Sequence, residues 1–236
     1  MKTIRKILLL ALLLGTSFIA GAKTEKISEL PKVEPEAIRV FIVRHAETYH
    51  QIKKLDHDSE LYYKITPNGV KQSKAVGEAL KKQPIVACYS SVTDRTKKTL
   101  QLTGLPALKK LKAIQEKAFN RPKSGLTEDG KPSTFSWRIE QWKNNNDSQP
   151  KGGESLAQAI KRSVKFIKKQ KHAYGKAIIV VSHGDIIAGM VGAAEGEPVW
   201  DYWEKFAAAS SSICVVDIHK SKPAILRAFN IKVWEK

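Results

Sequence analysis

Residues 40–48 constrain the fold more than any other part of the chain. Val40-Phe41-Ile42-Val43 is a short run of β-branched and aromatic residues, typical of a strand that is buried on both faces. The chain then turns at once into the polar sequence Arg44-His45-Ala46-Glu47-Thr48, which a buried strand would not contain. In open α/β folds, ligands bind beyond the carboxyl ends of the strands. The stretch therefore predicts an α/β protein with Arg44 and His45 at the functional edge of its sheet.

Strand and helix patterns alternate along the rest of the chain. Further strand-like apolar runs lie at residues 85–89, 108–114, 178–181, 213–218 and 224–229. A helix is expected to start at Thr66-Pro67, because threonine is a good N-cap and proline suits the first helical position. This alternation predicts a mostly parallel central sheet with helices on both faces.

The first 22 residues have the pattern of a signal peptide. They contain Lys2, Arg5 and Lys6, continue with an apolar run at 7–19 and end in Ala20-Gly21-Ala22. The apolar run is short for a membrane span, although an uncleaved anchor is the alternative. We therefore expect cleavage after Ala22, a periplasmic or secreted protein, and no stable membrane insertion of the mature chain.

The remaining sequence predicts a single domain with one insertion. Its length of 236 residues and its 42% hydrophobic content suit one hydrophobic core. Residues 23–38 are polar and contain two prolines, which indicates a linker or an N-terminal arm before a domain at 39–236. Within this domain, residues 117–153 lose the periodic pattern and are rich in Pro, Gly and Asn. We expect them to form a cap over the edge of the sheet.

The formal charge of +18 favours an anionic partner, because a positive field concentrates anions near the surface. Loss of the signal peptide would lower this charge by only three. The lysines are dispersed and lack the interleaved aromatic residues on which bases stack, so we expect no nucleic acid partner. We expect instead a small phosphate ester or another phosphorylated anion.

Cysteine and histidine spacing gives no metal-binding pattern, and we expect neither a metal nor another cofactor. Cys88 and Cys214 each lie inside an apolar strand-like run. Two buried thiols that pack as small hydrophobic groups are favoured over a disulfide.

Polar residues follow three of the expected strands. The three junctions are Arg44-His45, Ser90-Ser91 followed by Arg95, and Ser182-His183-Gly184. If these strands are parallel neighbours, two imidazoles and two guanidinium groups surround one point. Glu116 follows the expected strand at 108–114 and would lie beside them.

These residue types suit the transfer of a phosphoryl group. Arginine offers planar, bidentate donors to a phosphate dianion. A neutral imidazole can attack phosphorus, and a protonated one can stabilise the charge on the equatorial oxygens. A carboxylic acid can donate a proton to the leaving alkoxide. The backbone N–H of Gly184, at the opening of a helix, adds a further phosphate donor.

Five motifs, in order along residues 39–230, resemble those of the histidine phosphatase superfamily, also called phosphoglycerate mutase-like. They are Arg44-His45-Ala46-Glu47-Thr48, Ile65-Thr66-Pro67-Asn68-Gly69-Val70-Lys71-Gln72, Ser90-Ser91 with Arg95, Gly153-Glu154-Ser155, and Ser182-His183-Gly184. The resemblance implies that His45 is a phosphorylated nucleophile in a phosphate pocket completed by Arg44, Arg95 and His183. It implies Glu116 as the proton donor, with Glu47 as a second candidate. Gln51 stands where the family often has an asparagine that binds phosphate.

The resemblance favours an exported phosphomonoesterase that acts through phosphohistidine. A narrow specificity, such as for the sugar phosphates of lipopolysaccharide, is one form of this hypothesis. Phosphoglycerate-mutase-type transfer is an alternative, although residues 116–120 read Glu-Lys-Ala-Phe-Asn where mutases have Glu-Arg-His-Tyr-Gly. A non-catalytic binder of anionic envelope phosphates is another. Selection of the leaving group is expected in the cap, at Arg121, Lys123, Trp137, Arg138 and Trp142.

Overall fold

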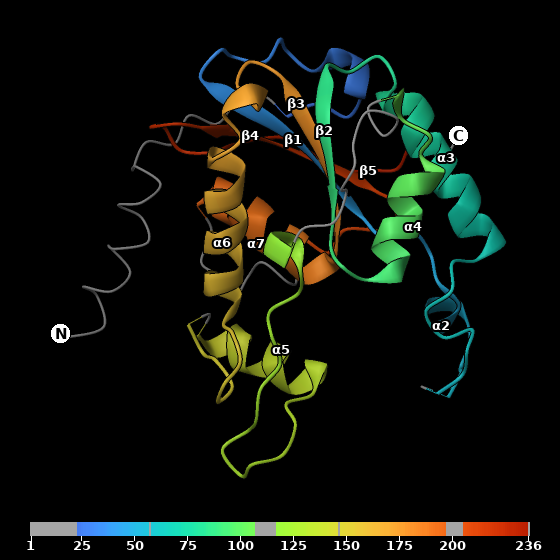
Figure 1. The fold of residues 1–236 in the computed structure, drawn as a ribbon, viewed down its shortest axis with the longest axis vertical. Helices are drawn as coiled ribbons and strands as arrows, with labels where there is room; N and C mark the ends of the chain where they lie inside the picture. Colours follow the sequence, from blue (N-terminus) through green and yellow to red (C-terminus); the bar gives the residue numbers. More distant parts are fainter. Residues whose placement is uncertain (1–22, 57, 107–116, 146, 197–204, 236) are drawn as a thin grey trace.

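A five-stranded mixed sheet runs through the protein (Figure 1). The structure is a computed structural model that describes residues 23–235 apart from 57, 107–116, 146 and 197–204. The strands are β1 (Ala37–Arg44), β2 (Ile85–Ser90), β3 (Ala177–Ser182), β4 (Ile213–His219) and β5 (Ile225–Ile231). Their order is β2-β3-β1-β4-β5. β1, β2 and β3 are parallel, whereas β4 and β5 add antiparallel pairings.

The two central parallel strands are buried because nearly all their residues are apolar. Every residue of β3 is buried, and in β1 only the terminal Arg44 is partly exposed. The predicted strand around the 40–43 run is thus confirmed and extends from 37 to 44. The predicted strand at 108–114 and the predicted signal peptide at 1–22 lie outside the described residues.

Helices cover both faces of the sheet, as the sequence predicts (Figure 1). The two helices of one face, α3 (Pro67–Leu80) and α4 (Asp94–Leu102), pack Val76, Leu80 and Leu100 against Phe41 and Val43 of β1. The opposite face carries α6 (Leu156–Lys168) and α7 (Gly184–Glu195), with Ile160, Ile167 and Ile187 against Val40 and Ile42. Alternate residues of β1 therefore enter two separate cores.

The segment before β1 lies on the domain and helps to bury an ion pair. It contains the 3-10 turn Ile27–Glu29, and Ile27 and Val33 are buried. Arg39 donates to both carboxylate oxygens of Asp217 at 2.8 Å and to the carbonyl of Pro31 at 2.6 Å. The arm thus provides a hydrogen-bond partner for a charged group inside the sheet.

The cap contains a helix that the sequence pattern does not predict. This helix, α5 (Phe135–Asn144), starts at Thr134, whose side-chain oxygen accepts from the backbone N–H of Trp137 at 3.1 Å. It lies apart from the sheet, beyond the N-terminal end of α6 (Figure 1). Its ten residues make too few turns to show a clear helical spacing of apolar residues. For this reason the sequence pattern predicts an irregular segment here. The other short elements are α2 (Tyr49–Ile52) and the 3-10 turns Lys117–Phe119 and Lys171–Ala173.

Both cysteines are free and buried, as the sequence favours. Cys88 packs in the core beneath α3 and α4, whereas Cys214 packs on the α6 and α7 side of the sheet. Burial raises the pKa of each thiol to about 12. The two side chains therefore behave as small hydrophobic groups.

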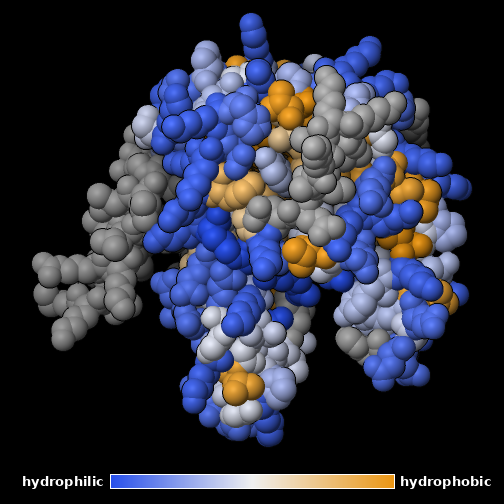
Figure 2. Space-filling view, in the orientation of Figure 1, coloured by the Kyte–Doolittle hydropathy of each residue, from blue (hydrophilic) through white to orange (hydrophobic). Residues whose placement is uncertain are grey.

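The face shown in Figure 2 is mainly hydrophilic, with isolated apolar patches. Among the helices of the described residues, none combines the length and the hydropathy that a membrane crossing needs.

Candidate active site

The three polar junctions lie at one edge of the sheet, because β1, β2 and β3 are parallel neighbours in register. Arg44 is opposite Ser182 in the β1–β3 pair, and Ser90 is opposite Val181 in the β2–β3 pair. The residues that follow each strand therefore leave the sheet side by side. The ring centroids of His45 and His183 are 5.6 Å apart.

His45 is held with one ring nitrogen free to attack. It is 5% exposed, and its Nδ1 lies 2.9 Å from the carbonyl oxygen of Ala46. Because a carbonyl can only accept, Nδ1 carries the proton and Nε2 keeps its lone pair. The Ala46 N–H in turn donates to the Thr99 hydroxyl at 2.9 Å, which fixes this loop to α4.

Close contact with α3 also shapes this loop. Thr66 caps α3 by accepting from the N–H of Gly69 at 2.9 Å, as the sequence predicts. A Cβ atom on Gly69 would lie only 2.4 Å from the carbonyl oxygen of Glu47. Glycine at this position therefore allows the first turn of α3 to approach the backbone beside the site.

His183 is placed between Arg95 and Ser91. Nη2 of Arg95 lies 3.2 Å from His183 Nδ1, and His183 Nε2 lies 2.9 Å from the Ser91 hydroxyl. The Arg95 guanidinium also stacks over the ring of Tyr63, with Cζ 4.8 Å from its centroid. His183 is 2% exposed, so both of its ring nitrogens depend on these neighbours for their hydrogen bonds.

The electrostatics of the cluster keep both imidazoles neutral. Burial lowers the pKa of His45 well below 6.5, and repulsion from Arg95, and from His183 whenever that ring is protonated, lowers it further. Burial and then the positive charges of Arg95, Arg121 and Arg44 likewise lower the pKa of His183 well below 6.5. A neutral His45 has the lone pair that a nucleophile needs.

Each of the two predicted phosphate-binding arginines has a side-chain N–H without a hydrogen-bond partner among the described residues. Arg44 donates from Nη1 to the carbonyl of Ala208 at 2.7 Å. The Nε atoms of Arg44 and Arg95 are buried and have no hydrogen-bond partner among the described residues. Burial lowers the pKa of both guanidinium groups, and the nearby charge of Arg121 lowers it further. An incoming dianion would relieve this mutual repulsion and supply acceptors.

Arg121 and Asp185 form an ion pair beside the cluster. The sequence pattern places Arg121 in the cap but does not single out Asp185. Arg121 donates from Nε to the carboxylate of Asp185 at 2.8 Å, and Asp185 is 1% exposed. Asp185 follows Gly184 at the start of α7, so Arg121 is held close to the second imidazole. No motif marks Asp185 as functional, and only the position directly after Ser-His-Gly could have drawn attention to it.

Three of the remaining predicted residues make contacts of other kinds. Gln51 completes a capping box of α2 and donates to the Ser210 hydroxyl at 3.0 Å. The carboxylate of Glu47 accepts from Thr66 at 2.6 Å and from Asn68 at 3.1 Å, at the start of α3. Gly184 is the first residue of α7. The phosphate-binding roles of Gln51 and Gly184 stay predictions.

Glu116 lies outside the described residues, so its predicted role as proton donor stays a prediction. The described part of the chain holds no cluster of three or more His, Cys, Asp or Glu side chains suited to a metal ion.

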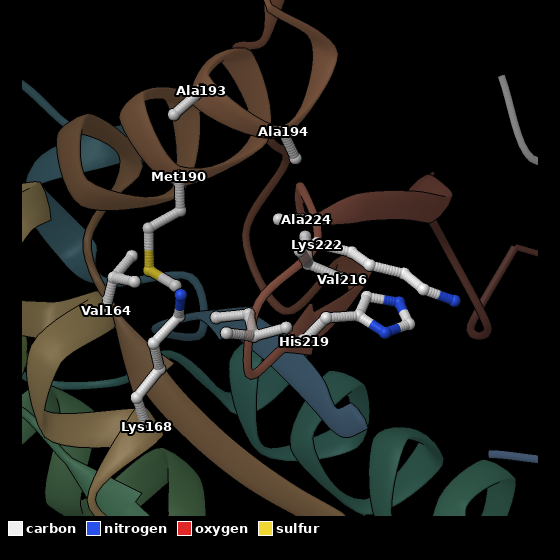
Figure 3. A pocket seen from close by; sticks show the side chains of 10 residues that line it. Val164, Lys168, Met190, Ala193, Ala194, Val216, His219, Lys222 and Ala224 are labelled. Carbon is white, nitrogen blue, oxygen red and sulfur yellow. The ribbon is translucent and has the colours of Figure 1, made fainter. Parts of the chain in front are cut away.

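A separate pocket lies at the other end of the sheet (Figure 3). Its volume is about 360 Å³, including space open to solvent, and its lining includes Val164, Met190, Val216 and His219. His219 pairs with Ala37 at the start of β1, whereas the two imidazoles lie beyond Arg44 at its end. This mainly apolar pocket therefore does not belong to the cluster.

Comparisons with known proteins agree with the geometry. The sequence model of the histidine phosphatase superfamily (branch 1) matches residues 40–231. A 2,3-bisphosphoglycerate-dependent phosphoglycerate mutase from Bradyrhizobium diazoefficiens is 29% identical over 172 residues, which cover 64% of this chain and 78% of the mutase. A metal-independent phosphoserine phosphatase from Arabidopsis thaliana is 28% identical over 186 residues, which cover 74% of this chain and 76% of the phosphatase.

Solved structures share the fold. A mycobacterial glucosyl-3-phosphoglycerate phosphatase in complex with VO3 has a TM-score of 0.59 at 20% identity, covering 82% of this chain and 99% of that one. A putative alpha-ribazole-5'-P phosphatase from Escherichia coli has a TM-score of 0.60 at 21% identity, covering 82% and 96%.

Proposed function

Because this chain belongs to branch 1 of the histidine phosphatase superfamily, we propose that it is a phosphomonoesterase that works through a phosphohistidine on His45. Its curated relatives include both phosphatases and mutases that act on small phosphorylated molecules. The observation that carries the proposal is the meeting of two buried imidazoles 5.6 Å apart, with Arg95 bonded to the second. A protein that only binds anions has no need of a free imidazole lone pair in such a cluster.

In the first step, Nε2 of His45 attacks phosphorus, the P–N bond forms and the P–O bond to the alcohol breaks. The proton on Nδ1 stays bonded to the carbonyl of Ala46, which keeps the ring oriented. Arg44, Arg95 and His183 bind the equatorial oxygens, on which negative charge spreads. A carboxylic acid, which we assign to Glu116, protonates the leaving alkoxide.

In the second step, water attacks phosphorus, the P–N bond breaks and inorganic phosphate leaves. Glu116, now ionised, accepts the proton of the attacking water and is ready for the next turnover. His45 returns to its neutral form with the Nε2 lone pair free.

Trapping the intermediate tests the proposal. The wild-type protein should acquire a base-stable, acid-labile label from a radiolabelled phosphate ester, and His45→Ala should lose both this label and turnover while it stays folded. His172→Ala changes an exposed histidine far along the chain and is the matched control. Near-normal activity in His45→Ala would show that another residue is the nucleophile.

A substrate panel separates hydrolysis from phosphoryl transfer. Sugar phosphates, nucleotides, phosphopeptides and inositol phosphates should release inorganic phosphate, and the pattern of rates defines the specificity. If 3-phosphoglycerate is instead isomerised only after priming with 2,3-bisphosphoglycerate, the protein is a mutase. Absence of both activities with retained phosphate binding would favour the non-catalytic binder.

We also propose that the protein is exported. The basic start, the short apolar run and the small residues up to Ala22 support this proposal. Sequencing the N-terminus of the mature protein from its own cells should give Lys23 as the first residue. A mature protein that retains Met1 would contradict cleavage.

A further inference from the structure

We propose that Asn120 is a positioning residue that acts through Ser91 to decide which ring nitrogen of His183 carries the proton. The inference rests on the proposed function, because it concerns the same phosphate pocket. Asn120 belongs to the cap segment that follows the Lys117–Phe119 turn, and its side-chain oxygen bonds to Ser91 and Val92 rather than to the imidazole. Its influence passes through a chain of hydrogen bonds whose direction is fixed at both ends.

One end of the chain is fixed by Arg95. A guanidinium can only donate, so His183 Nδ1, 3.2 Å from Nη2 of Arg95, must be the acceptor. The proton of the neutral ring is therefore on Nε2, which donates to the Ser91 hydroxyl at 2.9 Å.

The other end is fixed by the backbone N–H of Val92. It donates to Oδ1 of Asn120 at 2.9 Å, which identifies this atom as the carbonyl oxygen of the amide. The same oxygen lies 3.0 Å from the Ser91 hydroxyl, which must donate to it. Because the hydroxyl proton of Ser91 is committed to Asn120, only its lone pairs face His183.

This arrangement decides where His183 gains its next proton. With Nε2 already protonated, the incoming proton adds to Nδ1, on the side of Arg95 and the phosphate pocket. Without the Asn120 oxygen, the Ser91 hydroxyl could turn and donate to Nε2. The proton of the neutral ring could then move to Nδ1, where it would face the N–H groups of Arg95 before a phosphate is bound to accept from both.

The motif Gly153-Glu154-Ser155 holds Asn120 in place. Glu154 accepts from Nε of Arg162 at 2.7 Å and from Nη2 at 2.9 Å. Nη2 of Arg162 then donates to the carbonyls of Asn120 at 2.6 Å and Arg121 at 3.3 Å. Continuous contacts therefore lead from the start of α6 to the second imidazole.

Two substitutions at one position test the inference. Asn120→Ala removes the acceptor and should lower kcat/KM for p-nitrophenyl phosphate by about tenfold, as expected for one hydrogen bond in a buried network. Asn120→Asp keeps the acceptor and should restore kcat/KM to within about threefold of wild type. Asn145→Ala makes the same change at an exposed cap residue and should have no effect.

The NMR shifts of the imidazole nitrogens report the tautomer of His183 directly. A change at Asn120 that affected only the fold would leave this tautomer unchanged. In wild type, Nε2 of His183 should have the shift of a protonated nitrogen and Nδ1 that of an unprotonated one. Asn120→Ala should mix the two forms, whereas Asn120→Asp should keep the wild-type pattern and raise the pH at which the ring gains its second proton, since a negative charge favours the cation.

An unchanged tautomer in Asn120→Ala would overturn the inference, as would equal losses in Asn120→Ala and Asn145→Ala. The NMR measurement needs no turnover. If the wild-type protein hydrolyses no ester, the proposed function fails, and the tautomer still decides the role of Asn120.

Discussion

Arg95→Lys should separate the geometric contribution of this arginine from its charge. Arg95 donates to His183 at 3.2 Å, stacks on Tyr63, and has a buried Nε with no hydrogen-bond partner among the described residues. Lysine keeps the positive charge but loses the planar fork. One hydrogen bond to a charged group contributes about 1.5–3 kcal/mol. Since about 1.4 kcal/mol is a factor of ten, kcat/KM should fall about 10- to 150-fold.

Steady-state kinetics with p-nitrophenyl phosphate would measure this loss, and inhibition by inorganic phosphate would show whether binding of the dianion weakens in parallel. Tyr63→Phe is the control, because it keeps the ring beneath the guanidinium and removes only the hydroxyl. Its kcat/KM should fall less than that of Arg95→Lys, because the guanidinium and its stacking on the ring are kept. If Arg95→Lys stays within about threefold of wild type, Arg95 does not bind the phosphoryl group in a bidentate manner.

Acid should destabilise the fold below about pH 6.5, because the unfolded chain binds protons at His45 and His183 before the folded chain does. Thermal unfolding between about pH 8 and about pH 5 checks this, and inorganic phosphate should reduce the loss. Glu116→Gln should slow alkyl phosphates far more than p-nitrophenyl phosphate in rate assays, whereas equal slowing would indicate another acid. Asp217→Asn should lower the free energy of unfolding in urea by about 3–5 kcal/mol, since it leaves the Arg39 charge buried and unpaired, without changing KM.

The sequence predicts those parts of the fold that depend on local patterns. The apolar run before Arg44 and the Thr66 cap are local signals, and both elements form where they were expected. Convergence of the strand ends follows from the parallel order of three strands, which alternation with helices favours. Nothing local specifies that β4 and β5 pair in the antiparallel direction, because a short apolar run looks the same in either direction.

The contacts of the cap could not be predicted in the same way. Asn120 and Arg121 stand in an irregular segment whose position depends on carbonyl groups held by Arg162, more than 40 residues further along the chain. The pair of Arg121 with Asp185 likewise joins residues 64 positions apart. Side chains held by such distant partners carry no periodicity, and their meeting depends on the packing of α6 and α7 against the sheet.

The positive charges around the two imidazoles favour one kind of ligand, a phosphoryl dianion. Burial and then the charges of Arg95, Arg121 and Arg44 lower the pKa of His183, so the cluster without ligand resists a further proton. A bound phosphoryl dianion offsets these charges and accepts from their unused N–H groups, which raises the pKa of His183. His183 can then become a cation, whereas burial and the charge on His183 lower the pKa of His45 and keep it neutral. The same field thus keeps the nucleophile ready before binding and allows the second imidazole to gain its proton only when there is negative charge to stabilise.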